Sequence, residues 1–207
     1  MEIIKGRVKT AIKTVIYGPE GIGKTTFASA FPHPVVFIDT EGGTRHMDVA
    51  RTPAPTSWAM LMEQIKYFSG HVNEAATLVI DTADWAEKLC IEMICARAQV
   101  DGLEGFGYGK GYVYLQEEFG RMLNELTALV DRGVHVVLVA HAQMRKFEQP
   151  DEMGAYDRWE MKLSKKVAPM VKEWADMVLF ANYKTIVVNT DGQGAALPDE
   201  TAAALTE

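Results

Sequence analysis

The sequence predicts an α/β domain built on a mostly parallel central sheet. Short apolar runs alternate with longer segments of helical periodicity, which is the pattern of strands joined by crossover helices. The chain has 207 residues, of which 48% are apolar and 24% charged, as in an ordinary globular domain. We expect one domain over residues 1–190 and a disordered tail over residues 191–207, where Gly, Ala and acidic residues dominate.

The overall charge and the apolar pattern narrow the classes of function. The formal net charge is −7, which argues against a general binder of polyanions but leaves room for a local basic surface. No apolar stretch approaches the roughly 18 residues needed to cross a bilayer. Cys90 and Cys95 are expected to be buried thiols, as in a reducing cytoplasm. We therefore expect a cytoplasmic protein with no membrane partner.

Three buried strands and two helices are expected in the first part of the chain. The strands are apolar runs that end in polar or glycine residues. Prolines at 32 and 34 end the first helix early, and a glycine closes the second. In chain order we expect a strand over Ile12–Tyr17, a loop over Gly18–Gly23, a helix over Lys24–Ala30, a strand over Val35–Ile38, a helix over Ser57–Phe68 closed by Gly70, and a strand over Leu78–Ile80.

A glycine-rich segment divides the second part of the chain. Asp84, with Glu87 three residues later, resembles a capping box that opens a helix. The polar segment after the fourth strand has no periodicity and predicts a loop. In order we expect a helix from Asp84 to Gln99, a loop over Gly102–Gly111, a helix over Val113–Arg132, a strand over Val134–Ala140, a loop over Gln143–Leu163, a helix over Lys165–Asp176, and a terminal strand pair over Met177–Ala181 and Thr185–Asn189.

The loop after the first strand fits the P-loop pattern G-x-x-x-x-G-K-[ST]. Its glycines let backbone N–H groups wrap a phosphate, and the start of the following helix adds a positive dipole end. Lys24 is expected to reach the β- and γ-phosphates, and the Thr25 hydroxyl to hold Mg²⁺. We therefore predict that ATP and Mg²⁺ bind here, at Gly18, Pro19, Glu20, Gly21, Ile22, Gly23, Lys24, Thr25 and Thr26.

Polar residues at the ends of three further strands complete a candidate catalytic site. Asp81 ends the third strand, where open parallel sheets place their ligands, and is expected to bind Mg²⁺ directly or through water. Hydrolysis also needs a group that activates water. We assign that role to Glu41, with Asp39 as the alternative, because Thr82 stands where many P-loop ATPases carry a glutamate.

His141 follows the fourth strand and is a candidate sensor of the γ-phosphate. The alternative is a histidine that only forms a hydrogen bond at the end of its strand. The remaining candidates for metal ligation, His33, His46 and His71, lack the spacing of a zinc site.

The residues at these strand ends resemble the RecA-type ATPase core. Phe37–Glu41 is similar to the strand that ends in the catalytic glutamate, Leu78–Thr82 to the Mg²⁺ strand, and Val137–His141 to the sensor strand. With the runs at Gly107–Tyr112 and Lys172–Asp176, the chain resembles the phage nucleotide-binding protein family, small RecA-like ATPases linked to single-strand annealing and recombination.

The resemblance implies a three-layer P-loop NTPase fold with a RecA-like core, ATPase activity and a homo-oligomer. It also implies the host cytoplasm as the location if the chain is phage-encoded. In RecA an aromatic residue shortly after the catalytic glutamate stacks on adenine. Residues 42–46, Gly-Gly-Thr-Arg-His, stand at that place here, so the adenine contact has no candidate in the sequence.

The resemblance also implies single-stranded DNA as a partner, facing two loops. In the first, over Gly102–Gly111, flexible glycines and aromatic rings suit base stacking beside a phosphate contact, although a packed aromatic loop is as good an interpretation. In the second, residues 141–172 hold seven basic and five acidic side chains, which is also compatible with a solvated loop. The candidate DNA contacts are Phe106, Tyr108, Lys110, Arg145, Lys146, Lys165 and Lys166.

Three functions are compatible with these motifs. The leading hypothesis is a Mg²⁺-dependent ATPase that acts with single-stranded DNA in phage recombination or annealing. The second is a nucleotide-gated assembly module that hardly hydrolyses ATP. The third is a P-loop nucleotide kinase, which usually carries an arginine-rich lid, whereas the one close basic pair here is Arg145 with Lys146.

Overall fold

The computed structural model describes residues 5–6, 10–148, 155–184, 187–190 and 193–196. The strands in this part are β1 (Lys13–Gly18), β2 (Val35–Asp39), β3 (Ala50–Arg51), β4 (Thr77–Asp81), β5 (His135–Glu148), β6 (Ala155–Met161), β7 (Met177–Phe180), β8 (Val187–Thr190) and β9 (Gln193–Ala196). The helices are α1 (Lys24–Ser29), α2 (Trp58–Gly70), α3 (Ala83–Ala98), α4 (Lys110–Asp131) and α5 (Val167–Trp174), with 3₁₀ turns η1 (Gly43–His46), η2 (Val72–Glu74) and η3 (Leu103–Phe106). This alternation confirms the predicted α/β class.

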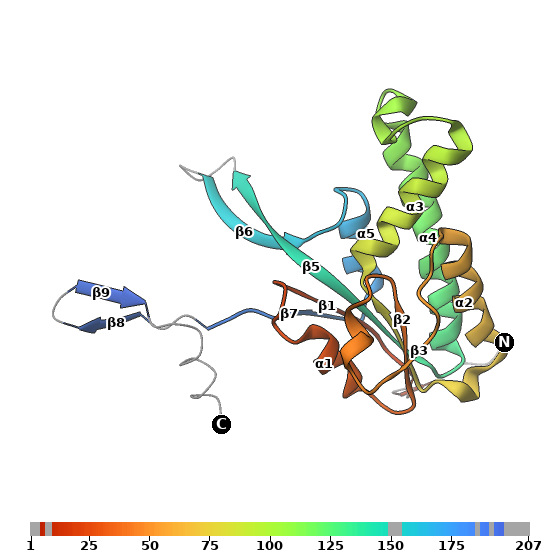
Figure 1. Ribbon diagram of the computed structural model, residues 1–207, viewed down its shortest axis with the longest axis horizontal. Helices are drawn as coiled ribbons and strands as arrows, with labels where there is room; N and C mark the ends of the chain where they lie inside the picture. The colour runs from red at the N-terminus through yellow and green to blue at the C-terminus, as the bar shows by residue number, and fades with distance from the viewer. Residues whose placement is uncertain (1–4, 7–9, 149–154, 185–186, 191–192, 197–207) are drawn as a thin grey trace.

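The central sheet has the strand order β3-β2-β4-β5-β1-β7, and every pair along this path is parallel (Figure 1). Parallel pairing brings the carboxyl ends of the strands to one edge. The register places Gly18 opposite His141 and Asp39 opposite Asp81. The strand ends that carry the predicted site therefore meet at a single edge of the sheet.

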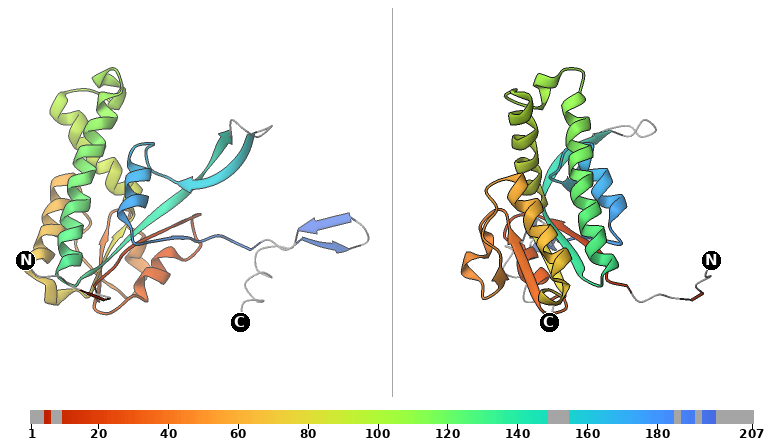
Figure 2. Two further views of the ribbon diagram at one scale, coloured as in Figure 1. Left: turned by 180° about the vertical axis from the view of Figure 1, so that it is seen from behind. Right: turned by 90° about the vertical axis from the view of Figure 1, so that its right-hand side faces the viewer.

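Helices cover both faces of the sheet, which confirms the predicted three layers (Figure 2). Helices α2, α3 and α4 pack on one face over the larger core, where the ring of Trp58 stacks on Phe119 at a centroid distance of 6.0 Å. Helix α1 packs on the other face over a smaller core that contains Ala28, Phe37 and Val137. The fold that the sequence predicts thus rests on two unequal cores.

The predicted loop over residues 143–163 is wrong, because most of this segment is a β-hairpin. Strand β5 continues to Glu148, and β6 pairs antiparallel with it from Ala142↔Met161 to Glu148↔Ala155. The hairpin projects away from the body of the molecule (Figure 1). Much of it lies in water, so its strands lack the apolar alternation that marks a half-buried strand.

Two further predictions about the ends of elements are wrong. The predicted capping box does not form: Thr82 occupies the N-cap of α3, while Asp84 and Glu87 accept hydrogen bonds from His141 and Ser164. Helix α4 begins three residues earlier than predicted, at Lys110, because the glycine-rich turn before it ends sooner.

The predicted terminal strand pair is also wrong. Strand β7 adds to the sheet beside β1, and β8 pairs with β9 instead. Residues 193–196 of the predicted tail therefore form a strand, and residues 191–192 and 197–207 lie outside the described residues. The short strand β3 and the 3₁₀ turns had no counterpart in the sequence pattern.

Both cysteines are free and buried, as predicted, and burial raises the pKa of each thiol. Among the described residues, no helix combines the length and the apolar character that crossing a membrane requires.

Candidate functional site

The P-loop leaves β1 at Gly18 and enters α1 at Lys24. Gly21 and Gly23 have φ angles of 74° and 91°, a region that favours glycine. The Lys24 ammonium donates to the carbonyls of Gly18 at 3.0 Å and Pro19 at 2.6 Å, and the residue is 6% exposed. Burial lowers the pKa of Lys24, and the Asp81 carboxylate opposes this shift. Two carbonyl groups of the P-loop therefore hold the Lys24 ammonium in place.

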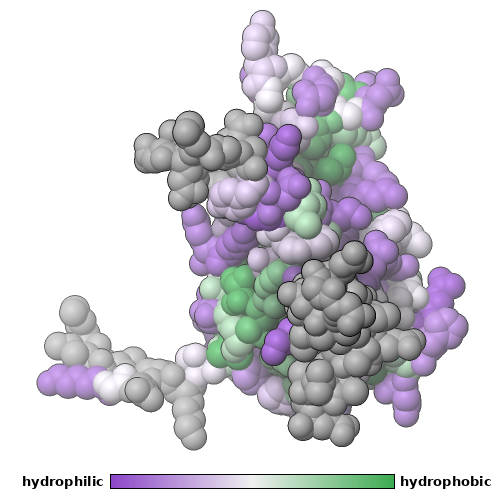
Figure 3. All heavy atoms as spheres, turned by 90° about the vertical axis from the view of Figure 1, so that its left-hand side faces the viewer, coloured by the Kyte–Doolittle hydropathy of each residue, from purple (hydrophilic) through white to green (hydrophobic). Residues whose placement is uncertain are grey.

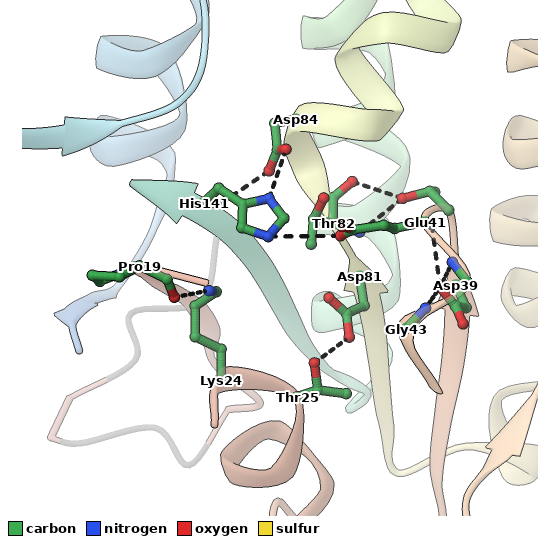
Figure 4. A network of polar contacts seen from close by, with 12 residues as sticks. Pro19, Lys24, Thr25, Asp39, Glu41, Gly43, Asp81, Thr82, Asp84 and His141 are labelled. Carbon is green, nitrogen blue, oxygen red and sulfur yellow. Dashed lines mark hydrogen bonds and ion pairs between the residues drawn. The ribbon is translucent and has the colours of Figure 1, made fainter. Parts of the chain in front are cut away.

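The two predicted Mg²⁺ ligands are in direct contact. The Thr25 hydroxyl donates to Asp81 Oδ2 at 2.7 Å (Figure 4). Burial raises the pKa of Asp81 to about 6, against the effect of the Thr25 hydrogen bond. A hydroxyl and a carboxylate are oxygen donors of the kind that Mg²⁺ prefers, and a cation would offset the burial of this charge. The residues present therefore fit the ion that the sequence predicts.

Asp39 organises the turn after β2. Its two carboxylate oxygens accept five hydrogen bonds, from the N–H groups of Glu41, Gly42, Gly43 and Thr44 and from the Thr44 hydroxyl. Burial alone would raise the pKa of Asp39, but these hydrogen bonds, above all those from Thr44, hold it below its usual value. A carboxylate occupied in this way fixes the position of Glu41 and is a poor activator of water.

Glu41 lies opposite His141, which is in turn held by Asp84 (Figure 4). Asp84 accepts from the His141 backbone N–H at 3.0 Å and pairs with its Nδ1 at 2.9 Å. The other ring nitrogen, Nε2, lies 3.7 Å from Glu41 Oε2, beyond hydrogen-bond range. Burial raises the pKa of Glu41, whereas the Asp84 hydrogen bond raises that of His141. The sheet edge thus carries a carboxylate of increased basicity beside an oriented imidazole.

Comparison with known proteins places the chain in a family. A family model described as an AAA domain matches residues 10–202. The chain belongs to this AAA domain family. No curated protein matches it. Among solved structures, a KaiC-like protein from the hyperthermophilic archaeon Pyrococcus horikoshii is similar over 91% of this chain and 90% of that chain, at 13% identity and a TM-score of 0.39.

The family and the observed P-loop identify a nucleotide-binding domain of P-loop ATPase type. Of the site residues predicted from the sequence, the structure of this AAA domain brings Lys24, Thr25, Glu41, Asp81 and His141 to the same edge of the sheet.

Sequence reasoning missed Asp84, which orients the candidate sensor. Asp84 lies one residue inside α3, and its side chain is 8% exposed. The signal that was available is its position three residues after Asp81, which places it on the first turn of the helix that leaves the same sheet edge. Sequence reasoning also missed the contact of Glu87, which lies one turn later on α3. Both its carboxylate oxygens accept from the Ser164 N–H.

The two candidate DNA segments of the AAA domain lie together, although they are distant in sequence. One groove is lined by Tyr108, Tyr112, Arg145, Lys165 and Lys166, among others. The adjoining groove shares Arg145 and Lys165 and adds Lys146, Arg158 and Lys172. It also contains Glu160, which pairs with Arg145 at 3.6 Å and with Arg158. Basic side chains from the β5–β6 hairpin and from the start of α5 therefore meet an aromatic loop.

The aromatic residues of this loop differ in their availability. Tyr108 is fully exposed, with a φ of 49° between glycines that also have positive φ. Phe106 packs against the core and the ring of Tyr114, at a centroid distance of 5.4 Å, and the Tyr112 hydroxyl donates to Glu104. Lys110, the remaining candidate here, is exposed on the first turn of α4. Of the three rings, Tyr108 is the one presented to solvent without a packing partner nearby.

We expect Asp84→Asn to lower the pKa of His141, because the carboxylate that stabilises the imidazolium is lost. The raised pKa stabilises the wild-type fold fully below the unfolded-state value of about 6.5, and this contribution is lost as pH rises through the folded-state value. NMR titration of the His141 ring without nucleotide measures the shift directly. The exposed Asp101→Asn is the control, and an unchanged midpoint in Asp84→Asn contradicts the assignment.

Proposed function

We propose that this AAA domain is a Mg²⁺-dependent ATPase that acts with single-stranded DNA in phage recombination or annealing. The observation that supports hydrolysis is the position of Glu41 and His141 beside the phosphate-binding lysine and the Thr25–Asp81 pair. A nucleotide kinase or a passive switch needs the P-loop, but neither needs a basic carboxylate at this place. The phage role rests on the sequence resemblance.

Each residue has a distinct part in the proposed reaction. The backbone of the P-loop and the Lys24 ammonium would bind the phosphates, while Thr25 and Asp81 would hold Mg²⁺. When bound, Mg²⁺ supplies positive charge that offsets the charge developing on the phosphate oxygens.

Glu41 acts as the general base. It takes a proton from water as the water oxygen forms a bond to the γ-phosphorus, and the bond to the β–γ bridging oxygen breaks to release ADP. Burial raises the pKa of Glu41 and so strengthens it as a base. His141, held by Asp84, has its Nε2 3.7 Å from Glu41 Oε2 and responds to the loss of negative charge there when Glu41 takes the proton.

We expect Glu41→Gln to retain binding of Mg-ATP and to lose turnover by about a hundred-fold or more, because the amide cannot take the proton. Lys24→Ala is expected to lose the binding of Mg-ATP. Thermal stabilisation by Mg-ATP measures binding, and phosphate release measures turnover. The exposed Glu63→Gln on α2 is the control for a lost carboxylate.

The two variants also separate the alternatives. Unchanged turnover in Glu41→Gln would favour the nucleotide-gated module, in which hydrolysis has no role. Full thermal stabilisation of Lys24→Ala by Mg-ATP would show that the phosphate site is misassigned.

The proposed DNA site is the pair of grooves between Tyr108 and the basic side chains. Stacking on Tyr108 and phosphate contacts to Lys165 and Lys166 supplement one another, as an acidic protein needs a local site to hold a polyanion. This surface is tied to the nucleotide site, because the Lys162 N–H donates to the His141 carbonyl at 2.8 Å. A movement of His141 would therefore displace the segment that carries Lys165 and Lys166.

We expect Tyr108→Ala to weaken single-stranded DNA binding by about 1–3 kcal/mol and to leave the salt dependence nearly unchanged, because only stacking is lost. The double variant Lys165→Gln, Lys166→Gln should instead flatten the salt slope by about one unit or more, at roughly 0.7 per phosphate contact. Fluorescence anisotropy of a labelled oligonucleotide at several salt concentrations distinguishes the effects.

The matched controls lie on α2, away from the grooves. They are Tyr67→Ala, which removes an aromatic ring that is 47% exposed, and Lys66→Gln, which removes a cation whose side chain is 60% exposed. If the groove variants bind like wild type at every salt concentration, these grooves are not the DNA site.

A homo-oligomer and a location in the host cytoplasm belong to the same proposal and rest on the sequence resemblance. Lys162, Lys165 and Lys166 are the candidates for contacting the γ-phosphate of a neighbouring subunit. A monomeric mass in light scattering with ATP and DNA present is the result that would exclude the oligomer.

A further inference from the structure

Two arginines lie directly opposite each other in the β5–β6 hairpin. The register pairs Arg145 of β5 with Arg158 of β6. Like charges at opposite positions of an antiparallel pair destabilise it, so the stability of the hairpin does not account for this arrangement. Figure 3 faces the side toward which the hairpin projects and shows mainly hydrophilic side chains there, above a hydrophobic patch. The hairpin therefore presents concentrated positive charge at a polar part of the surface.

Glu160 contacts both guanidinium groups. The Arg158 Nε donates to Glu160 Oε1 at 2.7 Å, and the Arg158 Nη2 donates to the same oxygen. The other oxygen, Glu160 Oε2, lies 3.6 Å from Arg145 Nη1. The hydrogen bond from Arg158, together with the charge of Arg145, lowers the pKa of Glu160, so this carboxyl group is ionised at neutral pH. One negative charge therefore faces two positive charges.

The groove around these side chains adds further positive charge. It has a volume of about 400 Å³ and lies between the hairpin and α5. Among the described residues that line it, five are basic and Glu160 alone is acidic. The basic residues are Arg145, Lys146, Arg158, Lys165 and Lys172. Glu160 therefore offsets only part of the charge, and the groove suits a ligand with several negative charges.

The pairing of Glu160 is open to exchange with another anion. The side chain of Glu160 is 19% exposed, that of Arg145 30% and that of Arg158 42%. Ion pairs that water reaches in this way are weak. A backbone phosphate carries its charge on two oxygens, which match the planar fork of donors on a guanidinium group. Such a phosphate can replace the Glu160 carboxylate and leave both arginines with an anionic partner.

We propose that Arg145 and Arg158 form a clamp for a backbone phosphate of single-stranded DNA, and that Glu160 occupies this clamp in the free protein. The inference rests on the proposed binding of DNA in these grooves. When a strand binds, its phosphate displaces Glu160 from the two guanidinium groups, and Lys146, Lys165 and Lys172 lie close enough to meet neighbouring phosphates. Until then, Glu160 reduces the repulsion between the two arginines and competes with the strand.

The test measures the binding of a labelled single-stranded oligonucleotide by fluorescence anisotropy at several salt concentrations. Glu160→Gln is expected to tighten binding about five-fold, because the phosphate no longer has to break the ion pairs. It should also steepen the salt slope by roughly 0.7, the value of one phosphate contact on a single strand. Arg158→Gln should instead weaken binding and flatten the slope by a similar amount. An ion pair that only supported the hairpin would weaken binding in both variants.

Two controls isolate the clamp from general electrostatics. Asp157→Asn removes an exposed carboxylate from the same strand and should change affinity less than two-fold. When Arg145 and Arg158 are both replaced by glutamine, adding Glu160→Gln should have no larger effect than Asp157→Asn, because Glu160 acts through these arginines. Thermal unfolding of each variant, followed by circular dichroism, verifies that it is folded.

A methylphosphonate oligonucleotide of the same sequence tests whether the clamp binds phosphate charge. This strand has no backbone charge, so wild type and Glu160→Gln should bind it equally. A gain in Glu160→Gln that persists with this strand would overturn the inference, since the variant would then act on contacts to the bases.

The outcomes separate this inference from the proposed function. If the wild type binds the charged oligonucleotide while Glu160→Gln weakens binding or gains no more than Asp157→Asn, Glu160 is not a competitor and the DNA site stands. If Glu160→Gln binds and the wild type does not, the inference holds in its strongest form. If neither protein binds, the proposed DNA function fails and the clamp fails with it.

Discussion

The parallel register of the central strands is the constraint on which the site depends. It sets Gly18 against His141 and Asp39 against Asp81, so that the residues which end β1, β2, β4 and the apolar half of β5 share one edge. A shift of one residue would turn the following side chains to the opposite face of the sheet. The buried apolar strands resist such a shift, because it would carry Ile80 and Leu138 out of the larger core and into the smaller one, which is packed around other side chains. The core therefore determines where the polar residues stand.

Hydrogen bonds make the burial of charge at this edge tolerable: Asp84 pairs with His141, while Lys24 binds two backbone carbonyls and Asp81 the Thr25 hydroxyl. Lys24, Asp81, Asp84 and His141 each expose little surface, and each has a partner that satisfies it. Such groups are costly to bury alone and hold one another in place when paired. The Asp84 pairing orients His141, whose carbonyl accepts from the Lys162 N–H at 2.8 Å in the segment with the basic side chains. The nucleotide edge and the basic grooves are thus joined by a short series of hydrogen bonds.

The sequence was sufficient to predict the residues whose chemistry and spacing are local. The P-loop, the strand that ends in Asp81 and the position of Glu41 follow from short motifs next to apolar runs. The β5–β6 hairpin did not follow, because strands in water need no apolar alternation. Asp84 was interpreted as a helix cap, since its partner His141 is 57 residues away and no local pattern reveals such a contact. Whether Tyr108 or Phe106 is exposed also depends on tertiary packing, which the glycine-rich sequence does not encode locally.

The central claim is that the edge shared by Lys24, Glu41 and His141 hydrolyses ATP and is coupled to a DNA-binding surface. The most direct test is the steady-state rate of ATP hydrolysis by the full chain with Mg²⁺, measured with and without a single-stranded oligonucleotide. The account predicts measurable hydrolysis that increases when the oligonucleotide is added. No hydrolysis under either condition, or a rate indifferent to the oligonucleotide across the range in which it binds, would contradict it.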